Sequence, residues 1–117
     1  MISLICFTYN EEKYIKDLLV SLCSLEPITK QIIIVDGNSK DNTVDLVQKY
    51  IAKNSVKNIE IINNPERYVS HGFNRAFEIA KGEYIALIGA HTKYPANYLE
   101  EAITQLNSNR CDAIGGP

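Results

Sequence analysis

The chain has 117 residues, with 12 basic and 14 acidic side chains and a formal net charge of −2. This length suits one small domain, and the balanced charge without a basic run argues against a nucleic-acid-binding surface. Its three cysteines are scattered and form no CxxC pair. That pattern is typical of reduced thiols in a cytosolic protein rather than of a disulfide scaffold.

The sequence has no window of 18 apolar residues, and its initial apolar stretch is too short for a signal peptide and has no basic flank. We therefore expect a cytoplasmic protein, with the inner face of the membrane as the alternative for a full-length form. The last residues begin a new apolar step and stop at Pro117. This ending leads us to expect a chain cut from a longer protein.

Apolar periodicity predicts the first three elements. Residues 2–7 form an apolar run of strand length, and residues 11–25 carry an i, i+3, i+4, i+7 stripe typical of a helix that Pro27 ends. Residues 31–36 include four consecutive β-branched side chains. A strand that is apolar on both faces is typical of a parallel sheet covered by helices.

The alternation continues toward the C-terminus. Ser39 can cap a second helix, and residues 58–63 form a shorter strand expected near a sheet edge. Ser70 can cap a third helix, which Gly82 would end. The apolar face of that helix comprises Phe73, Ala76, Phe77 and Ala80. Later elements are a strand at residues 84–88, a helix from Pro95 and a strand start at residues 111–114.

Strands alternating with helices predict a doubly wound α/β sheet in one domain, or part of one. Ligands of such sheets bind outside the carboxyl ends of the strands. Polar segments follow three predicted strands, at residues 8–12, 36–39 and 89–92. These three segments are the candidate binding site.

Four segments in order resemble the family 2 glycosyltransferases of the GT-A fold, which use nucleotide-activated sugars. They are residues 8–12 (TYNEE), 35–43 (VDGNSKDNT), 80–86 (AKGEYIA) and 90–99 (AHTKYPANYL), the last resembling a polysaccharide-biosynthesis subgroup. The resemblance implies a three-layer, mostly parallel sheet with helices on both faces and strand order 3-2-1-4. It also implies that residues 1–117 are the nucleotide-sugar-binding part, without the acceptor-binding half.

Each candidate side chain also has a structural alternative. Tyr9 could lie against a uracil-type base or pack on the first helix, and Thr8 and Asn10 could hydrogen-bond the base or cap that helix. Glu11 could contact the donor or favour the helix N-terminus. Asp36 ends an apolar strand, so its carboxylate must be solvated, paired or hydrogen-bonded, either by a nucleotide or by the protein.

Further along the chain the evidence is thinner. Asn38 could contact the donor but more simply shapes the turn before the second helix. Asn74 could face the site, whereas Arg75 suits a surface or phosphate contact. Phe73 stands near a position where many members of the family carry an arginine, and its helical spacing favours core packing instead.

The resemblance implies a divalent metal, Mn²⁺ or Mg²⁺, on the donor diphosphate, with His91 as its ligand and Ala90 beside the donor. A lone loop histidine is usually not a ligand. Gly89 replaces the first aspartate of the family's metal motif, and Gly37 replaces a second aspartate seen in many members. Gly89 offers no side-chain acceptor, which argues against efficient turnover.

The implied reaction is inverting transfer of a sugar from a nucleotide sugar, a UDP-sugar by preference, to a glycan or lipid-linked acceptor. The general base that it needs lies in the family's second half, so we nominate no catalytic residue and expect no transfer by this chain alone. The alternative is a non-catalytic nucleotide-binding or interaction module. An exposed sheet edge would favour a homo-oligomer.

Overall fold

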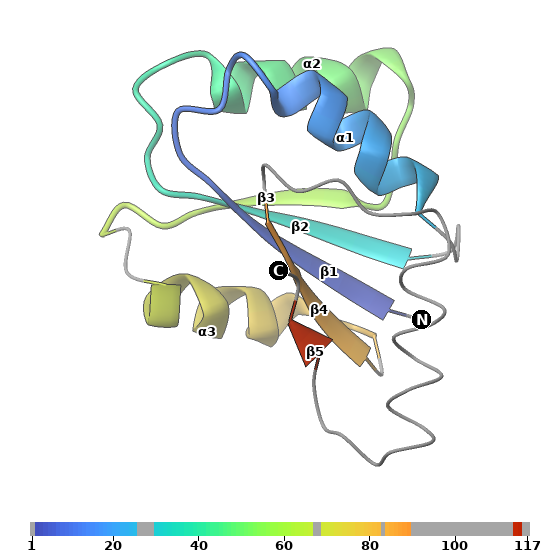
Figure 1. Ribbon diagram of the computed structural model, residues 1–117, viewed down its shortest axis with the longest axis vertical. Coiled ribbons are helices and arrows are strands. Elements are labelled where there is room, and N and C mark those ends of the chain that lie inside the picture. Colours follow the sequence, from blue (N-terminus) through green and yellow to red (C-terminus); the bar gives the residue numbers. More distant parts are fainter. Residues whose placement is uncertain (1, 26–29, 67–68, 83, 90–113, 116–117) are drawn as a thin grey trace.

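The computed structural model describes residues 2–25, 30–66, 69–82, 84–89 and 114–115. Within them, a parallel sheet has the strand order β3-β2-β1-β4-β5 (Figure 1). The strands are β1 (Ile2–Thr8), β2 (Lys30–Asp36), β3 (Ile59–Asn63), β4 (Tyr84–Ile88) and β5 (Ile114–Gly115), and the helices are α1 (Ile15–Ser24), α2 (Thr43–Lys53) and α3 (Val69–Ile79). The predicted order 3-2-1-4 is confirmed, and β5 extends the sheet beyond β4.

Helices cover both faces of the sheet: α1 and α2 lie on one side and α3 on the other (Figure 1). Alternate residues of the central strands enter two separate cores. Leu4 and Ile34 belong to the core under α1 and α2, whereas Ile5 and Val35 belong to the core with α3. Every residue of β2 is buried, as the run of β-branched side chains predicts.

Helix α1 buries the predicted stripe of Ile15, Leu18, Leu19 and Leu22. It begins at Ile15 rather than at Glu11, because residues 11–14 form a turn in which the Glu11 carbonyl accepts the amides of Tyr14 and Ile15. At the other end, the Lys30 ammonium donates to the carbonyls of Cys23 and Leu25, at 3.1 and 2.8 Å. This cation satisfies carbonyls that the end of a helix leaves without intrahelical partners.

Three sequence predictions about the helices are wrong. Helix α2 begins at Thr43 with Asn42 in the cap position, so Ser39 does not cap it. Helix α3 begins at Val69, which places Ser70 inside the first turn, and ends at Ile79. Phe77, predicted to be core, is 56 % exposed, whereas Ala76 is buried and Phe73 packs partly against the core.

Cys6 and Cys23 stand among apolar residues in the sequence, which predicts buried thiols. Cys6 is buried as predicted, whereas Cys23 is only half-buried. None of the helices in the described ranges is both long and apolar enough to cross a bilayer. Pro27, Cys111 and the helix predicted from Pro95 lie outside the described residues.

Candidate site at the carboxyl ends of β1 and β2

The polar segments that follow β1 and β2 lie side by side. Thr8 and Asp36 are register partners at the ends of the two strands. The Gly37 amide donates to the Thr8 carbonyl at 2.9 Å, which carries the pairing one step beyond the strands. Parallel pairing therefore brings together two predicted segments that are 28 residues apart in sequence.

Asp36 is 2 % exposed, and its carboxylate is held by protein groups. Oδ1 accepts the hydroxyls of Thr8 at 2.9 Å and Ser39 at 2.6 Å, and Oδ2 accepts the Ser39 amide at 2.8 Å. These contacts show the structural role that the sequence left open for Asp36. A carboxylate has about four acceptor sites, so this network leaves capacity for one further donor.

Asn10 connects the loop that follows β1 with the loop that follows β2. Its backbone N–H donates to the Ser39 hydroxyl oxygen at 2.8 Å, and its side-chain oxygen accepts the Lys40 backbone N–H at 2.8 Å. Its φ of 51° lies in the left-handed region, which asparagine tolerates better than most residues. Neither Asn10 nor Thr8 caps α1, so that alternative is wrong for both. Asn38 also has a positive φ, 62°, and its side chain is exposed.

A second set of bonds ties the same loop to the start of α2. The Glu11 amide donates to the Thr43 hydroxyl oxygen at 2.8 Å, and the Glu12 amide donates to Asp41 Oδ2 at 3.2 Å. The Thr43 hydroxyl in turn donates to Asp41 Oδ1. Asn42 Nδ2 closes the set by donating to Glu12 Oε1 at 3.0 Å.

The surroundings of Asp41 favour its charged form. Desolvation acts to raise the pKa of Asp41, but hydrogen bonds from Thr43 and from the Glu12 amide outweigh it and hold that pKa below its ordinary value. A carboxylate that accepts several hydrogen bonds is stabilised as the anion. Asp41 and Thr43 were not among the site residues expected from the sequence, although both lie in the segment 35–43 that resembles the family.

Three successive backbone amides, those of residues 10–12, therefore donate to side-chain oxygens of Ser39, Thr43 and Asp41. In dinucleotide-binding folds the first strand-to-helix turn offers such amides to a pyrophosphate. Here they are already used. This turn is consequently better suited to the nucleoside end of a ligand than to its phosphates.

Tyr9 and Cys6 also lie near the carboxyl end of β1. Tyr9 is 37 % exposed, so its ring is accessible to a ligand. Burial, with a smaller contribution from the Glu11 carboxylate, raises the pKa of the nearby Cys6 thiol to about 12. Cys6 is therefore a neutral thiol at ordinary pH and not a nucleophile.

On the α3 side, Arg75 contacts the loop after β3. It donates to the Asn63 carbonyl at 2.9 Å and pairs with Glu66 at 3.4 Å, so the predicted surface contact is the one observed. Asn74 lies beside it on α3 with an exposed side chain. Asn64 was not expected in the site. It is 2 % exposed, and its backbone N–H donates to the Asp36 carbonyl at 2.7 Å.

The third predicted segment begins at Gly89, which follows β4 and is half-buried. Ala90 and His91 lie outside the described residues. In the described part of the chain, no three His, Cys, Asp or Glu side chains gather as a metal site would require. The proposed metal ligand therefore stays a prediction.

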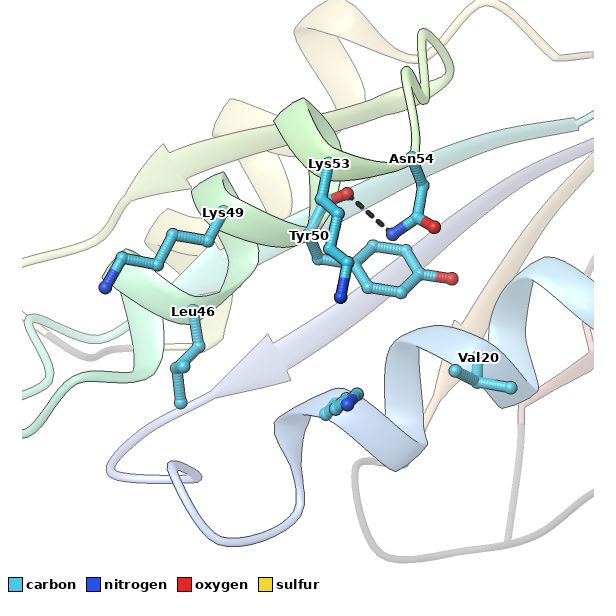
Figure 2. A pocket seen from close by; sticks show the side chains of 7 residues that line it. Val20, Leu46, Lys49, Tyr50, Lys53 and Asn54 are labelled. Atoms are coloured by element: carbon cyan, nitrogen blue, oxygen red, sulfur yellow. Dashed lines mark hydrogen bonds between the residues drawn. The ribbon is translucent and has the colours of Figure 1, made fainter.

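A hollow of about 410 Å³ lies elsewhere, between α1 and α2 (Figure 2). It is lined by Lys16, Val20, Leu46, Lys49, Tyr50, Lys53 and Asn54. None of the predicted site residues lines it. The strand ends, and not this hollow, are the candidate functional site.

Comparison with known proteins identifies the family. The model of glycosyl transferase family 2 matches residues 3–117. The chain therefore belongs to family 2 of the glycosyltransferases, as the sequence resemblance predicted.

Named relatives act in glycan synthesis. One is a dolichyl N-acetyl-α-D-glucosaminyl phosphate 3-β-D-2,3-diacetamido-2,3-dideoxy-β-D-glucuronosyltransferase of Methanococcus voltae. It is 33 % identical over 104 residues, which cover 87 % of this chain and 32 % of the relative. The chain thus spans about a third of that protein's length.

Solved structures agree on the fold. Staphylococcus aureus TarS, a poly(ribitol-phosphate) β-N-acetylglucosaminyltransferase solved with UDP-GlcNAc, matches with a TM-score of 0.75 and 26 % identity, over 93 % of this chain and 32 % of its own. A Pyrobaculum calidifontis mannosyltransferase, solved with GDP-Man and Mn²⁺, matches with a TM-score of 0.81 and 24 % identity, over 90 % of this chain and 32 % of its own. The architecture is that of GT-A glycosyltransferases.

Proposed function

We propose that this member of glycosyltransferase family 2 binds the nucleoside of a sugar-nucleotide donor, a UDP-sugar by preference, at the ends of β1 and β2. The observation that carries the proposal is the buried Asp36 carboxylate, fixed by Thr8 and Ser39 at the edge of the sheet where such folds bind ligands. The complex of TarS with UDP-GlcNAc supports the choice of uridine.

In this proposal Asp36 Oδ2 accepts a hydrogen bond from the N–H of the base, using the acceptor capacity that the protein leaves. Tyr9, with its exposed ring, offers a flat face to the base. Thr8, Asn10 and Glu11 act mainly by holding the loop that carries Tyr9. Asn38 and Asn74 are exposed and would complete the donor site at its rim, with Ala90 beyond β4.

A divalent cation, Mn²⁺ or Mg²⁺, belongs to the proposal through the family resemblance, with His91 as its ligand. The cation would neutralise charge that develops on the diphosphate leaving group.

For the chain by itself we propose donor binding without transfer. Inverting transfer needs a base at the acceptor hydroxyl, and the chain spans only about a third of its glucuronosyltransferase relative. A glycan or lipid-linked acceptor and a cytoplasmic location remain proposals on the family resemblance. Because β5 pairs with β4 at Ala86 and Leu87, the exposed edge expected beyond β4 is covered at these residues. Self-association through the apolar surface near β4, where the Leu87 side chain is 37 % exposed, is testable by light scattering, and a monomer would contradict it.

Calorimetric titration of UDP, with and without Mn²⁺, tests the proposed function. We expect binding that tightens with Mn²⁺. Replacing the exposed Tyr9 by alanine should weaken it about tenfold, which corresponds to about 1.4 kcal/mol. Tyr14→Ala is the matched control, because Tyr14 is also exposed, at 56 %, but lies at the start of α1.

No binding of UDP or GDP in either condition would contradict the proposal. It would favour the alternative, a non-catalytic module that keeps the fold without donor chemistry. Metal-independent binding of UDP would retain the nucleoside site but overturn the metal part of the proposal.

A further inference from the structure

We propose that Thr43 is a positioning residue for the donor site: its hydroxyl, oriented by Asp41, fixes the loop of residues 9–12 and so sets the affinity for the nucleotide. This inference rests on the proposed function. It assigns a role to Asp41 and Thr43, which lie in the segment that resembles the family but were not among the site residues expected from the sequence.

The structure contains the same arrangement twice. In the first, the Ser39 hydroxyl donates to the Asp36 carboxylate at 2.6 Å while its oxygen accepts the Asn10 amide at 2.8 Å. In the second, the Thr43 hydroxyl donates to Asp41 while its oxygen accepts the Glu11 amide at 2.8 Å. Each is a relay from a carboxylate through a hydroxyl to a backbone amide.

The carboxylates determine which way the hydroxyl hydrogen points in each relay. A hydroxyl has one proton to donate, and an anionic acceptor attracts it more strongly than a neutral one does. With that proton directed at Asp41, the Thr43 oxygen presents its lone pairs to the Glu11 amide. Donation to an anion also polarises the hydroxyl and strengthens the bond that its oxygen accepts.

Thr43 is well placed to hold the loop rigidly. Its side chain is fully buried at the first residue of α2, and the next turn of that helix is anchored in the core by Val47. The loop that it holds includes Tyr9 and Asn10, whereas the side chain of Thr43 hydrogen-bonds to Glu11 and Asp41. Removing its hydroxyl would therefore loosen the loop without removing a group that the proposal gives to the ligand.

A rigid loop matters because the cost of ordering it is paid on folding rather than on binding. If the amides of residues 10–12 lost their partners, the loop would sample other conformations. Nucleotide binding would then have to select the competent one, and the apparent affinity would fall by its population.

The experiment compares Thr43→Val, which keeps the shape but removes the hydroxyl, with Thr43→Ser, which keeps the hydroxyl. The first readout is NMR hydrogen exchange of the Glu11 amide in the absence of nucleotide. The second is the UDP dissociation constant by calorimetry. Asp41→Asn removes the charge that orients the Thr43 hydroxyl and tests the same relay in case Thr43→Val does not fold. Gln48→Ala, on the exposed side of α2, is the control.

We expect Thr43→Val to speed exchange at Glu11 and to weaken UDP binding, each by about tenfold, and Asp41→Asn to act in the same direction. Thr43→Ser should stay within about twofold of the wild type in both readouts. Faster exchange with unchanged UDP affinity in Thr43→Val would overturn the positioning role. Unchanged exchange would overturn the relay itself.

The two proposals fail in different ways. If the wild-type chain does not bind UDP, the proposed function is overturned, and the positioning role falls with it. The exchange readout, which needs no ligand, still decides whether the relay holds the loop. If the wild type binds UDP and Thr43→Val binds equally well, only the positioning role is wrong.

Discussion

The Thr8 hydroxyl donates to Asp36 Oδ1 at 2.9 Å, between two residues that are also register partners at the ends of β1 and β2. Both residues are buried, with 4 % and 2 % of their surfaces exposed. The same bond therefore connects the ends of β1 and β2 and orients the Asp36 carboxylate, which we propose hydrogen-bonds the nucleoside.

Thr8→Val should destabilise the fold and weaken UDP binding. The valine keeps the shape but removes a donor to a buried charged group, which costs about 1–3 kcal/mol in unfolding free energy. Urea unfolding followed by circular dichroism measures this cost. Thr8→Ser, which keeps the hydroxyl, is the control, and a Thr8→Val chain as stable as the wild type would show that the bond contributes little.

Gln31→Met should be strongly destabilising, although Gln31 lies at the start of β2, at the opposite end of the strand from Asp36. The side-chain Nε2 of Gln31 donates to the Ile79 carbonyl at 3.0 Å. The side-chain Oε1 of Gln31 accepts the Ser3 hydroxyl and the Lys81 backbone N–H, both at 2.8 Å. Methionine would leave these groups without their partner, at a cost of about 2–4 kcal/mol. Thermal or urea unfolding should show no comparable loss for the same change at the exposed Gln48.

Gly72→Ala should destabilise α3, against the usual gain for this change in a helix. A Cβ at Gly72 would come within 2.8 Å of side-chain atoms of Asn64, Phe7 and Val35. Overpacking of this kind costs about 1–3 kcal/mol. Asn74→Ala on the exposed side of α3 is the control, and equal unfolding midpoints for the two variants would contradict the close approach of α3 to the sheet.

Asp41 should make stability depend on pH in the acid range. Its pKa is lowered from the ordinary value of 3.8, so the unfolded chain binds the proton more readily than the native chain. The stability that Asp41 contributes is then present above pH 3.8 and is lost as the pH falls through its lower native pKa. Urea midpoints between pH 2.5 and 7 should fall less toward acid in Asp41→Asn than in the wild type.

The control for this measurement is Asp45→Asn, because Asp45 is an exposed carboxylate in the first turn of α2. If the Asp41 and Asp45 variants show the same acid dependence, the hydrogen bonds from Thr43 and the Glu12 amide do not favour the charged form of Asp41. That result would contradict the proposal that the Asp41 anion orients the Thr43 hydroxyl so that its oxygen faces the Glu11 backbone N–H.

The sequence by itself determined the elements and the layers. The stripe of Ile15, Leu18, Leu19 and Leu22 is buried as its spacing predicts, and β2 is buried on both faces as its β-branched run predicts. These predictions succeed because periodicity reports which face of an element is buried, and burial is a local property of the pattern. The two strand ends that form the candidate site were also visible as polar segments after apolar runs.

Only the tertiary structure decided what the polar side chains do. Ser39 looked like a helix cap and instead joins Asp36 to Asn10, and Thr43 joins Asp41 to Glu11. Hydroxyls and carboxylates near a helix start can bond either to their own helix or to a neighbouring loop. The choice depends on which amides the sheet register brings within reach, and Asn10 and Glu11 are 29 and 32 residues away in sequence from their hydroxyl partners.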